Sequence, residues 1–141
     1  MKDKIFFDTN IICYAFDLNE VFKRGTCEKL IKRVLNGEII GVVSNQVLGE
    51  LFNAATGKLG VDPDKARILV QAIITSEKWE KVNYTYETIN RAVEKFEHAE
   101  IPFWDLVIAE TLKENGIKEI ITENERDFRG VPGIKITNPF R

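Results

Sequence analysis

Residues 5–10 of this chain read IFFDTN, and this stretch decides the fold. The apolar run that opens it ends abruptly at Asp8, and a second apolar segment begins at Ile11, directly after Thr9 and Asn10. A short apolar run followed by a helical pattern predicts a buried strand joined directly to a helix. Asp8 then stands at the strand end, where it serves either as the N-cap of the helix or as a functional acid.

Strand and helix patterns alternate along the remainder of the chain. Apolar runs predict strands at 4–7, 38–43, 81–85, 119–122 and 133–137. Helical spacing and capping signals predict helices at 9–16 and 21–35, after Ser44, from Asp62-Pro63, at 88–97 and at 102–115. This alternation predicts an α/β fold, a three-layer α/β/α sandwich with a mostly parallel central sheet. The 141 residues fit a single domain over 1–141.

The composition excludes several classes of protein. With a formal net charge of −2 the chain is no basic nucleic-acid coat, so any nucleic acid must be held by a local patch or through cations. The single histidine, His98, excludes a zinc site built on several histidines, and its polar surroundings predict a solvated side chain. Cys13 and Cys27 lack metal-ligand spacing and are expected to be reduced residues that fill the core.

The chain shows no pattern of membrane insertion or export. No apolar run approaches the ~20 residues that cross a bilayer. The apolar run at 5–7 is also too short for a signal peptide, and charged residues surround it. We therefore expect a cytoplasmic protein that makes no contact with a membrane.

The helical pattern also predicts which side chains face inward. In helix 88–97 the inward residues are expected to be Ile89, Ala92, Val93 and Phe96. In helix 102–115, Asp105 shares a face with apolar residues, whereas Glu110 is expected to face solvent. Phe103 and Trp104 are expected to pack in the core in preference to stacking on nucleic-acid bases.

Three acids stand where a charged side chain is unusual. Asp8 follows a buried strand, Glu50 borders the apolar stripe of its helix, and Asp105 lies near the start of an inward face. Each has a structural explanation of its own: a helix cap, a boundary residue that reaches solvent, and an acid that favours the helix dipole. In a parallel sheet, however, the functional crevice lies beyond the carboxyl ends of the strands, where Asp8 stands.

Convergence of these acids would have a chemical consequence. Two carboxylates at ~4 Å repel by roughly 4 kcal/mol at an effective dielectric constant near 20. Such a cluster is stable only with protons or metal ions in it. Because its ligands would be hard oxygen atoms without histidine or thiolate, the expected ion is Mg²⁺ or Mn²⁺.

Four motifs, taken in order, resemble those of the PIN-domain nucleases. They are IFFDTN at 5–10, SNQVLGE at 44–50, WDLVIA at 104–109, and ITEN at 121–124 with Asp127-Phe128. The likeness covers nearly the whole chain, including the ending with Val131-Pro132-Gly133 and Asn138-Pro139. The compact single-domain form is similar to the VapC-type toxin ribonucleases of prokaryotic toxin–antitoxin pairs.

The resemblance implies roles for particular residues. Asp8, Glu50 and Asp105 match the family's acidic metal ligands. The family often carries a fourth acid two residues after the motif threonine, and here that position is Asn124, an amide. Asn124 would coordinate through its carbonyl or orient a water, and Asp127 is the nearest acid to take up the missing charge.

The resemblance also implies supporting residues around the ligands. Thr9, Asn10 and Thr122 match positions that hydrogen-bond the ligands and fix their rotamers. Glu123 is a weaker candidate than Asp127 for the fourth acid, because its side chain is expected to point to the other side of the strand end.

The function implied by the resemblance is a metal-dependent ribonuclease that hydrolyses phosphodiester bonds in single-stranded or structured RNA, with Mg²⁺ or Mn²⁺. The implied partners are the RNA substrate, a cognate antitoxin whose C-terminal segment docks near the crevice, and a second copy in a homodimer. Basic residues that could line an approach for the RNA backbone are Lys23, Arg24, Lys29, Lys32, Arg33, Lys58 and Arg67.

Two alternatives accompany this interpretation. A haloacid-dehalogenase-like phosphatase also places an Asp after its first strand, but it needs a second Asp two positions later, where this chain has Asn10. The other alternative is a catalytically weak or inactive PIN-like binding module in RNA processing, which the amide at Asn124 favours. A metal-dependent nuclease assay separates the enzyme from the binding module.

Overall fold

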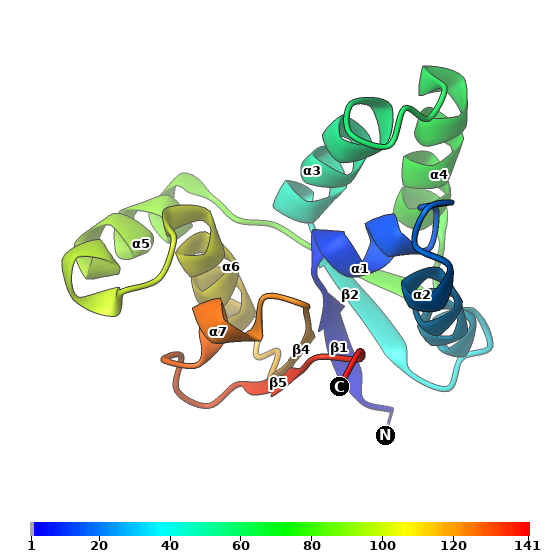
Figure 1. The fold of residues 1–141 in the computed structure, drawn as a ribbon. Helices are drawn as coiled ribbons and strands as arrows, with labels where there is room; N and C mark the ends of the chain where they lie inside the picture. The colour runs from blue at the N-terminus through cyan, green and yellow to red at the C-terminus, as the bar shows by residue number, and fades with distance from the viewer. Residues whose placement is uncertain (1) are drawn as a thin grey trace.

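A parallel sheet forms the centre of the computed structural model, which describes residues 2–141 (Figure 1). Its strands are β1 (Lys4–Phe7), β2 (Ile40–Ser44), β3 (Trp79–Val82), β4 (Glu119–Ile121) and β5 (Lys135–Thr137). They are ordered β3-β2-β1-β4-β5, and each neighbouring pair is parallel. The predicted α/β sandwich is confirmed, with β1 in the middle of a five-stranded sheet.

Helices cover the sheet on both sides. They are α1 (Thr9–Tyr14), α2 (Val21–Leu35), α3 (Asn45–Thr56), α4 (Pro63–Thr75), α5 (Tyr86–Ala99), α6 (Phe103–Glu114) and α7 (Glu125–Phe128). Figure 1 shows α5, α6 and α7 grouped on one side of the strands, whereas α1, α2 and α4 lie on the other. This arrangement buries both faces of the central strand, as a parallel sheet requires.

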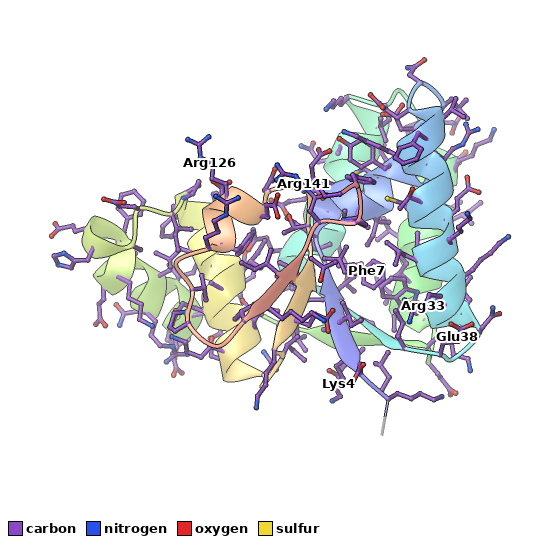
Figure 2. All side chains as sticks on the ribbon, turned by 60° about the horizontal axis from the view of Figure 1, so that its bottom comes forward. Lys4, Phe7, Arg33, Glu38, Arg126 and Arg141 are labelled. Atoms are coloured by element: carbon purple, nitrogen blue, oxygen red, sulfur yellow. The ribbon has the colours of Figure 1, made fainter. Side chains whose placement is uncertain are left out.

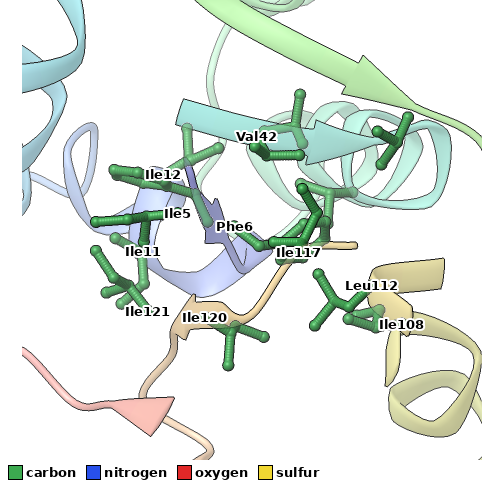
Figure 3. Close-up of a cluster of buried hydrophobic side chains, with 14 of the residues drawn as sticks. Ile5, Phe6, Ile11, Ile12, Val42, Ile108, Leu112, Ile117, Ile120 and Ile121 are labelled. Atoms are coloured by element: carbon green, nitrogen blue, oxygen red, sulfur yellow. The ribbon is translucent and has the colours of Figure 1, made fainter. Parts of the chain in front are cut away.

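The core is built around β1. Phe6 is fully buried and stands in register with Val42 of β2 and Ile120 of β4. Figure 3 shows this set of side chains together with Ile108 and Leu112, which reach the sheet from α6. The continuous apolar run of β1 is therefore explained by neighbours on both edges and helices on both faces.

Two predicted helix starts are confirmed by capping contacts, whereas α5, predicted over 88–97, begins earlier, at Tyr86. The Ser44 hydroxyl accepts the backbone N–H of Val47 at 3.2 Å and opens α3. The Asp62 side chain caps α4, with Pro63 in the first turn of the helix. These contacts satisfy backbone donors that a helix leaves free at its N-terminus.

The third strand ends earlier than predicted. The expected range was 81–85, whereas β3 covers Trp79–Val82. The Asn45 side chain explains the difference, because it accepts the N–H of Tyr84 at 2.9 Å and donates to the Tyr84 carbonyl at 3.3 Å. The backbone of Tyr84 is thus held by a side chain and does not continue the strand ladder.

The inward faces of two helices differ from prediction. Val93 and Phe96 of α5 are half exposed, although both were expected to face inward. Glu110 of α6, expected on the solvent side, is buried and accepts two hydrogen bonds of 2.9 Å from Lys95 of α5. Lys95 therefore contacts α6 through Glu110, while the half-exposed Phe96 packs edge-on against Phe103 of α6, with ring centroids 6.2 Å apart.

Other sequence-based expectations concern single residues. Cys27 is buried and Cys13 is partly buried, and both are free thiols. His98 is exposed, as predicted. Within residues 2–141, no helix combines the length and the apolar character needed to cross a membrane.

Close packing of β2 on β3 gives a test of this fold. A Cβ atom added at Gly41 would lie 2.6 Å from the ring of Trp79 and 2.9 Å from Cγ2 of Val34. We expect Gly41→Ala to lower the free energy of unfolding by about 1–3 kcal/mol, because the indole must shift in a packed core. Urea unfolding measures the change.

Gly25→Ala is the matched control, because a Cβ at this position in α2 has no neighbouring atom within 4 Å. It should leave the protein unchanged or stabilise it by up to about 1 kcal/mol, since alanine favours helix. Equal stability of the Gly41→Ala variant and the wild type would contradict the packing described for β2 and β3.

Candidate active site

An open cavity of ≈ 460 Å³ lies at the carboxyl ends of the central strands. Asp8 enters it from the end of β1, Glu50 from α3, Asp105 from α6 and Asn124 from the segment after β4. The other lining residues are Thr9, Asn10, Cys13, Tyr14, Asp17, Asn53, Ala54, Lys58, Leu59, Ile108 and Glu123. The structure therefore brings together acids that are remote from one another in the sequence.

Asp8 is held by hydrogen bonds on both carboxylate oxygens. Its Oδ1 accepts the backbone N–H of Thr9 at 2.8 Å, which makes Asp8 the N-cap of α1. Its Oδ2 accepts the Thr122 hydroxyl at 2.7 Å and the Asn10 amide at 3.3 Å. The same side chain thus caps α1 and enters the cavity, and its rotamer is fixed by α1 and by the residue that follows β4.

Burial controls the protonation of Asp8, whose side chain is almost entirely inaccessible to solvent. Removal from water raises the pKa of Asp8 above its ordinary value, while the hydrogen bonds from Thr122 and Thr9 oppose that rise. The negative charge of Glu50 adds to the rise. A nearby cation would reverse the balance and favour the ionised form.

Asp105 is the most strongly perturbed acid with a defined value. Burial, followed by a hydrogen bond with Asp127 and the charges of Asp8, Asp127 and Glu50, raises the pKa of Asp105 to about 7. At neutral pH the protonated and ionised forms of the Asp105 carboxyl are therefore about equally populated. Burial is the largest cause of this shift, and the neighbouring acids add to it because carboxylates that crowd together bind protons more tightly.

Glu50 occupies the exposed wall of the cavity on α3. Its Oε1 accepts the Thr9 hydroxyl at 2.8 Å, so the first residue of α1 links two acids, Asp8 through its backbone and Glu50 through its side chain. Thr9, Asn10 and Thr122 each donate to an acid of the cavity. Their supporting role in catalysis stays a prediction.

Glu123 differs from its prediction, since its side chain lines the same cavity as Asp8. Its carboxylate accepts the Tyr14 hydroxyl at 2.6 Å and pairs with the Lys23 ammonium. Burial acts to raise the pKa of Glu123, but the Lys23 and Tyr14 hydrogen bonds outweigh it and the pKa lies below its ordinary value. Its charge is thus neutralised within the protein. Sequence reasoning missed this pair because its members lie 100 residues apart.

Asn124 and Asp127, the two residues predicted as alternatives for a fourth ligand, lie in different places. Asn124 is exposed on the cavity wall, and its backbone N–H donates to the Thr122 hydroxyl at 3.0 Å. Asp127 is not among the lining residues, but it contacts Asp105 directly. The structure thus places the amide at the cavity and the acid behind Asp105.

The chemistry of these groups fits a hard divalent cation. Among residues 2–141, no ion pair involves Asp8, Glu50, Asp105 or Asp127. In the same part of the chain, no three His, Cys, Asp or Glu side chains stand in the arrangement of a metal site. The donors are carboxylate and amide oxygens, the ligand types of Mg²⁺ and Mn²⁺.

Trp104 departs from its predicted place in the core. The indole is 50% exposed, and it packs edge-on against Phe103 and Tyr84, with ring centroids 5.3 Å and 6.1 Å away. Its backbone carbonyl accepts the side-chain amide of Gln46 at 3.2 Å. The residue before Asp105 therefore presents an aromatic surface to solvent.

The same acids occupy the positions that suggested a nuclease family from sequence. The family model of the PIN domain matches residues 5–134. The chain belongs to the PIN domain family. The match includes all the acids of the cavity and β2, β3, β4 and most of β1, and it ends just before β5. The PIN fold, rather than a haloacid-dehalogenase fold, therefore provides the framework of this site.

Solved structures share this PIN fold along nearly the whole chain. The protein is similar to a chain of a toxin–antitoxin complex from Klebsiella pneumoniae, with a TM-score of 0.67 and 19% identity over 96% of this chain and 97% of that one. It is similar to VapC20 of Mycobacterium tuberculosis, a sarcin–ricin loop cleaving toxin, with a TM-score of 0.64 and 22% identity over 82% and 86%.

A third similar chain comes from the DNA-bound VapBC of Salmonella typhimurium, with a TM-score of 0.66 and 21% identity over 97% of this chain and 98% of that one. None of the curated proteins compared with this sequence matches it. At these identities the structural likeness establishes the fold, and the activity has to be argued from the cavity.

The pKa of Asp105 predicts how stability depends on pH without metal. The folded state raises this pKa from 3.8 to about 7, so folded protein binds the proton more tightly than unfolded protein. Proton binding by Asp105 therefore stabilises the folded state fully at pH values below the unfolded pKa, and this stabilisation is lost as the pH rises through the folded pKa. With EDTA at about pH 8, we expect Asp105→Asn to melt roughly 3–5 °C above wild type.

The control for this variant is its own behaviour in acid. Near pH 4 the wild-type carboxyl is protonated in the folded state, so the two melting temperatures should converge. Thermal unfolding followed by circular dichroism at both pH values measures the difference. A variant that melts below wild type at the higher pH would show that Asp105 is not destabilised by its acidic neighbours.

Proposed function

We propose that this PIN domain is a metal-dependent ribonuclease that hydrolyses phosphodiester bonds in single-stranded or structured RNA. One observation carries the proposal: Asp8, Glu50 and Asp105, from three separate elements, line one open cavity, and none of them forms an ion pair within residues 2–141. A protein that used these acids only for stability would pair them, as it pairs Glu123 with Lys23.

The residues that would hold the ion are Asp8, Glu50 and Asp105, with Asn124 offering its carbonyl oxygen. A bound Mg²⁺ or Mn²⁺ supplies Lewis acidity, which favours ionisation of a water and neutralises charge on the phosphate oxygens. Mg²⁺ is proposed as the ion used, with Mn²⁺ as its substitute. Because the donors are oxygens and the chain has a single histidine, a zinc centre is a poorer fit.

The side chains of this protein contribute orientation and proton control. The hydrogen bonds from Thr122 and Asn10 hold Asp8 in one rotamer, and Thr9 holds Glu50. Asp105 lies in hydrogen-bond contact with Asp127, and it would release its proton when positive charge enters the cavity. Asp127 thus acts on the site through Asp105, and Asn124 leaves the cavity one negative charge weaker than an acid would.

A nuclease assay with variants tests this function. Wild type should cleave a labelled pool of single-stranded RNA with Mg²⁺ or Mn²⁺ and lose the activity in EDTA. Asp8→Asn should reduce the rate by about 100-fold or more, because it removes a charged ligand from the cavity. Asp64→Asn, a change on the exposed surface of α4, is the matched control and should cleave at the wild-type rate.

Metal binding provides an independent measure of the same site. Mn²⁺ should raise the melting temperature of wild type, since it binds only the folded state, and Asp105→Asn should lose most of that rise. Equal cleavage by wild type and Asp8→Asn would remove the acids from the mechanism. RNA binding without metal-dependent cleavage would instead favour the alternative, a catalytically inactive PIN-like binding module.

The proposed biological role is the toxin of a toxin–antitoxin pair in the cytoplasm. The similar chains from Klebsiella pneumoniae and Salmonella typhimurium come from toxin–antitoxin and VapBC complexes, and the cavity opens to solvent, where a partner segment can enter. The proposed antitoxin docks its C-terminal segment near the cavity and places an arginine among the acids. A homodimer is also proposed.

Expression in a bacterial host tests the toxin role. Wild type should arrest growth, and Asp8→Asn should not, because growth arrest requires RNA cleavage. Co-expression of a small DNA-binding protein encoded beside the gene should restore growth and co-purify with the protein. Normal growth at a wild-type protein level that is confirmed by immunoblot would contradict the toxin role without affecting the nuclease assay.

A further inference from the structure

The acidic cavity contains one basic side chain. Of the described residues that line it, only Lys58 carries a positive charge in its side chain. Lys58 is exposed, and within residues 2–141 it forms neither an ion pair nor a side-chain hydrogen bond. Its ammonium group is therefore available to a ligand, in a place where unpaired carboxylates would otherwise repel phosphate.

The other basic residues that the sequence suggested as an approach for RNA either form ion pairs within the protein or lie away from the cavity. The ion pairs are Lys23 with Glu123, Arg24 with Glu28, Arg33 with Glu38, and Arg67 with Asp64. Figure 2 shows the Arg33 and Glu38 side chains beside each other at the end of α2. Lys29 and Lys32 lie on the exposed side of α2 and do not line the cavity.

Lys58 also stands at a junction. It lines both the acidic cavity and a larger adjoining groove between the start of α2 and the α3–α4 connection. Three acids and three bases line that groove, and Arg24 is paired there with Glu28. Lys58 is thus the basic residue common to the cavity and the groove, at the point where an RNA strand would pass from one to the other.

We propose that Lys58 binds a backbone phosphate of the RNA strand next to the phosphate that is cleaved. The proposal rests on the ribonuclease function above and names one substrate-binding residue for it. Lysine suits this task as a compact charge on a flexible stem, because it contacts a phosphate without reading the base. The contact would position the RNA strand independently of its base sequence, and salt would weaken it.

Steady-state cleavage of the labelled RNA pool tests Lys58→Gln. We expect KM to rise about fivefold to tenfold with kcat within about twofold, because the lost contact binds substrate and does not act on the reacting bond. Between about 50 and 200 mM KCl, the slope of log(kcat/KM) against log[KCl] should become shallower by about 0.7, the value for one phosphate of a single strand. Lys58→Arg should restore most of the affinity.

Lys78→Gln is the matched control, since Lys78 is an exposed lysine beside the opposite end of the sheet. It changes the net charge equally and should leave KM and the salt slope unchanged. Unchanged RNA kinetics in Lys58→Gln, while wild type cleaves, would overturn the proposal. The same result with weakened binding of an acidic protein segment would assign Lys58 to a protein partner and would also overturn it.

Binding of the labelled RNA to the Asp8→Asn protein, measured by fluorescence anisotropy, separates the two hypotheses. If wild type cleaves no RNA but Lys58→Gln weakens binding about fivefold or more in the Asp8→Asn background, the phosphate contact stands and the nuclease function fails. If binding in this background is independent of Lys58, the phosphate contact fails whatever the cleavage assay shows.

Discussion

The hydrogen bonds to the buried carboxylate of Asp8 connect the sheet to the site. Thr122, at the end of β4, donates to Asp8 at the end of β1, and the N–H of Asp8 donates to the carbonyl of Ile121. These contacts extend the β1–β4 pairing by one step beyond the last apolar residues. Because they satisfy an acid that burial would otherwise make costly, the strand ends and the floor of the cavity form one unit.

Much of this unit follows from the sequence because its signals are local. Residues 5–10 contain the strand, its buried acid and the start of a helix, and the structure has all three. The alternation of strands and helices is equally local, so the α/β class and the sheet's parallel character were predictable. Strand ends were less so: β3 stops where the Asn45 side chain binds Tyr84, a contact between residues 39 positions apart.

Ion pairs between residues that are distant in the sequence could not be predicted, because local sequence patterns contain no information about the partner. Glu110 was expected to face solvent and Glu123 to point to the other side of the strand end. In the structure Glu110 is buried against Lys95, and Glu123 lines the cavity and pairs with Lys23. The helical period places such a residue on a face of its own helix, but its partner belongs to another element. Trp104 is the reverse case, since an aromatic residue expected inside remains half exposed.

The distribution of these pairs separates two kinds of acid around one cavity. Glu123 has its own ammonium partner and a pKa below the ordinary value, whereas Asp105 is crowded by acids and has a pKa of about 7. The first is stable without a ligand, and the second binds either a proton or an external cation. The acids that lack an ion-pair partner within the described residues are thereby concentrated near Asp8 and Asp105. Lys58 lines the same cavity and has no ion-pair partner among residues 2–141. A cavity with unpaired acids on one side and an unpaired lysine beside them favours a ligand that combines a divalent cation, for the acids, with a phosphate chain, for the lysine.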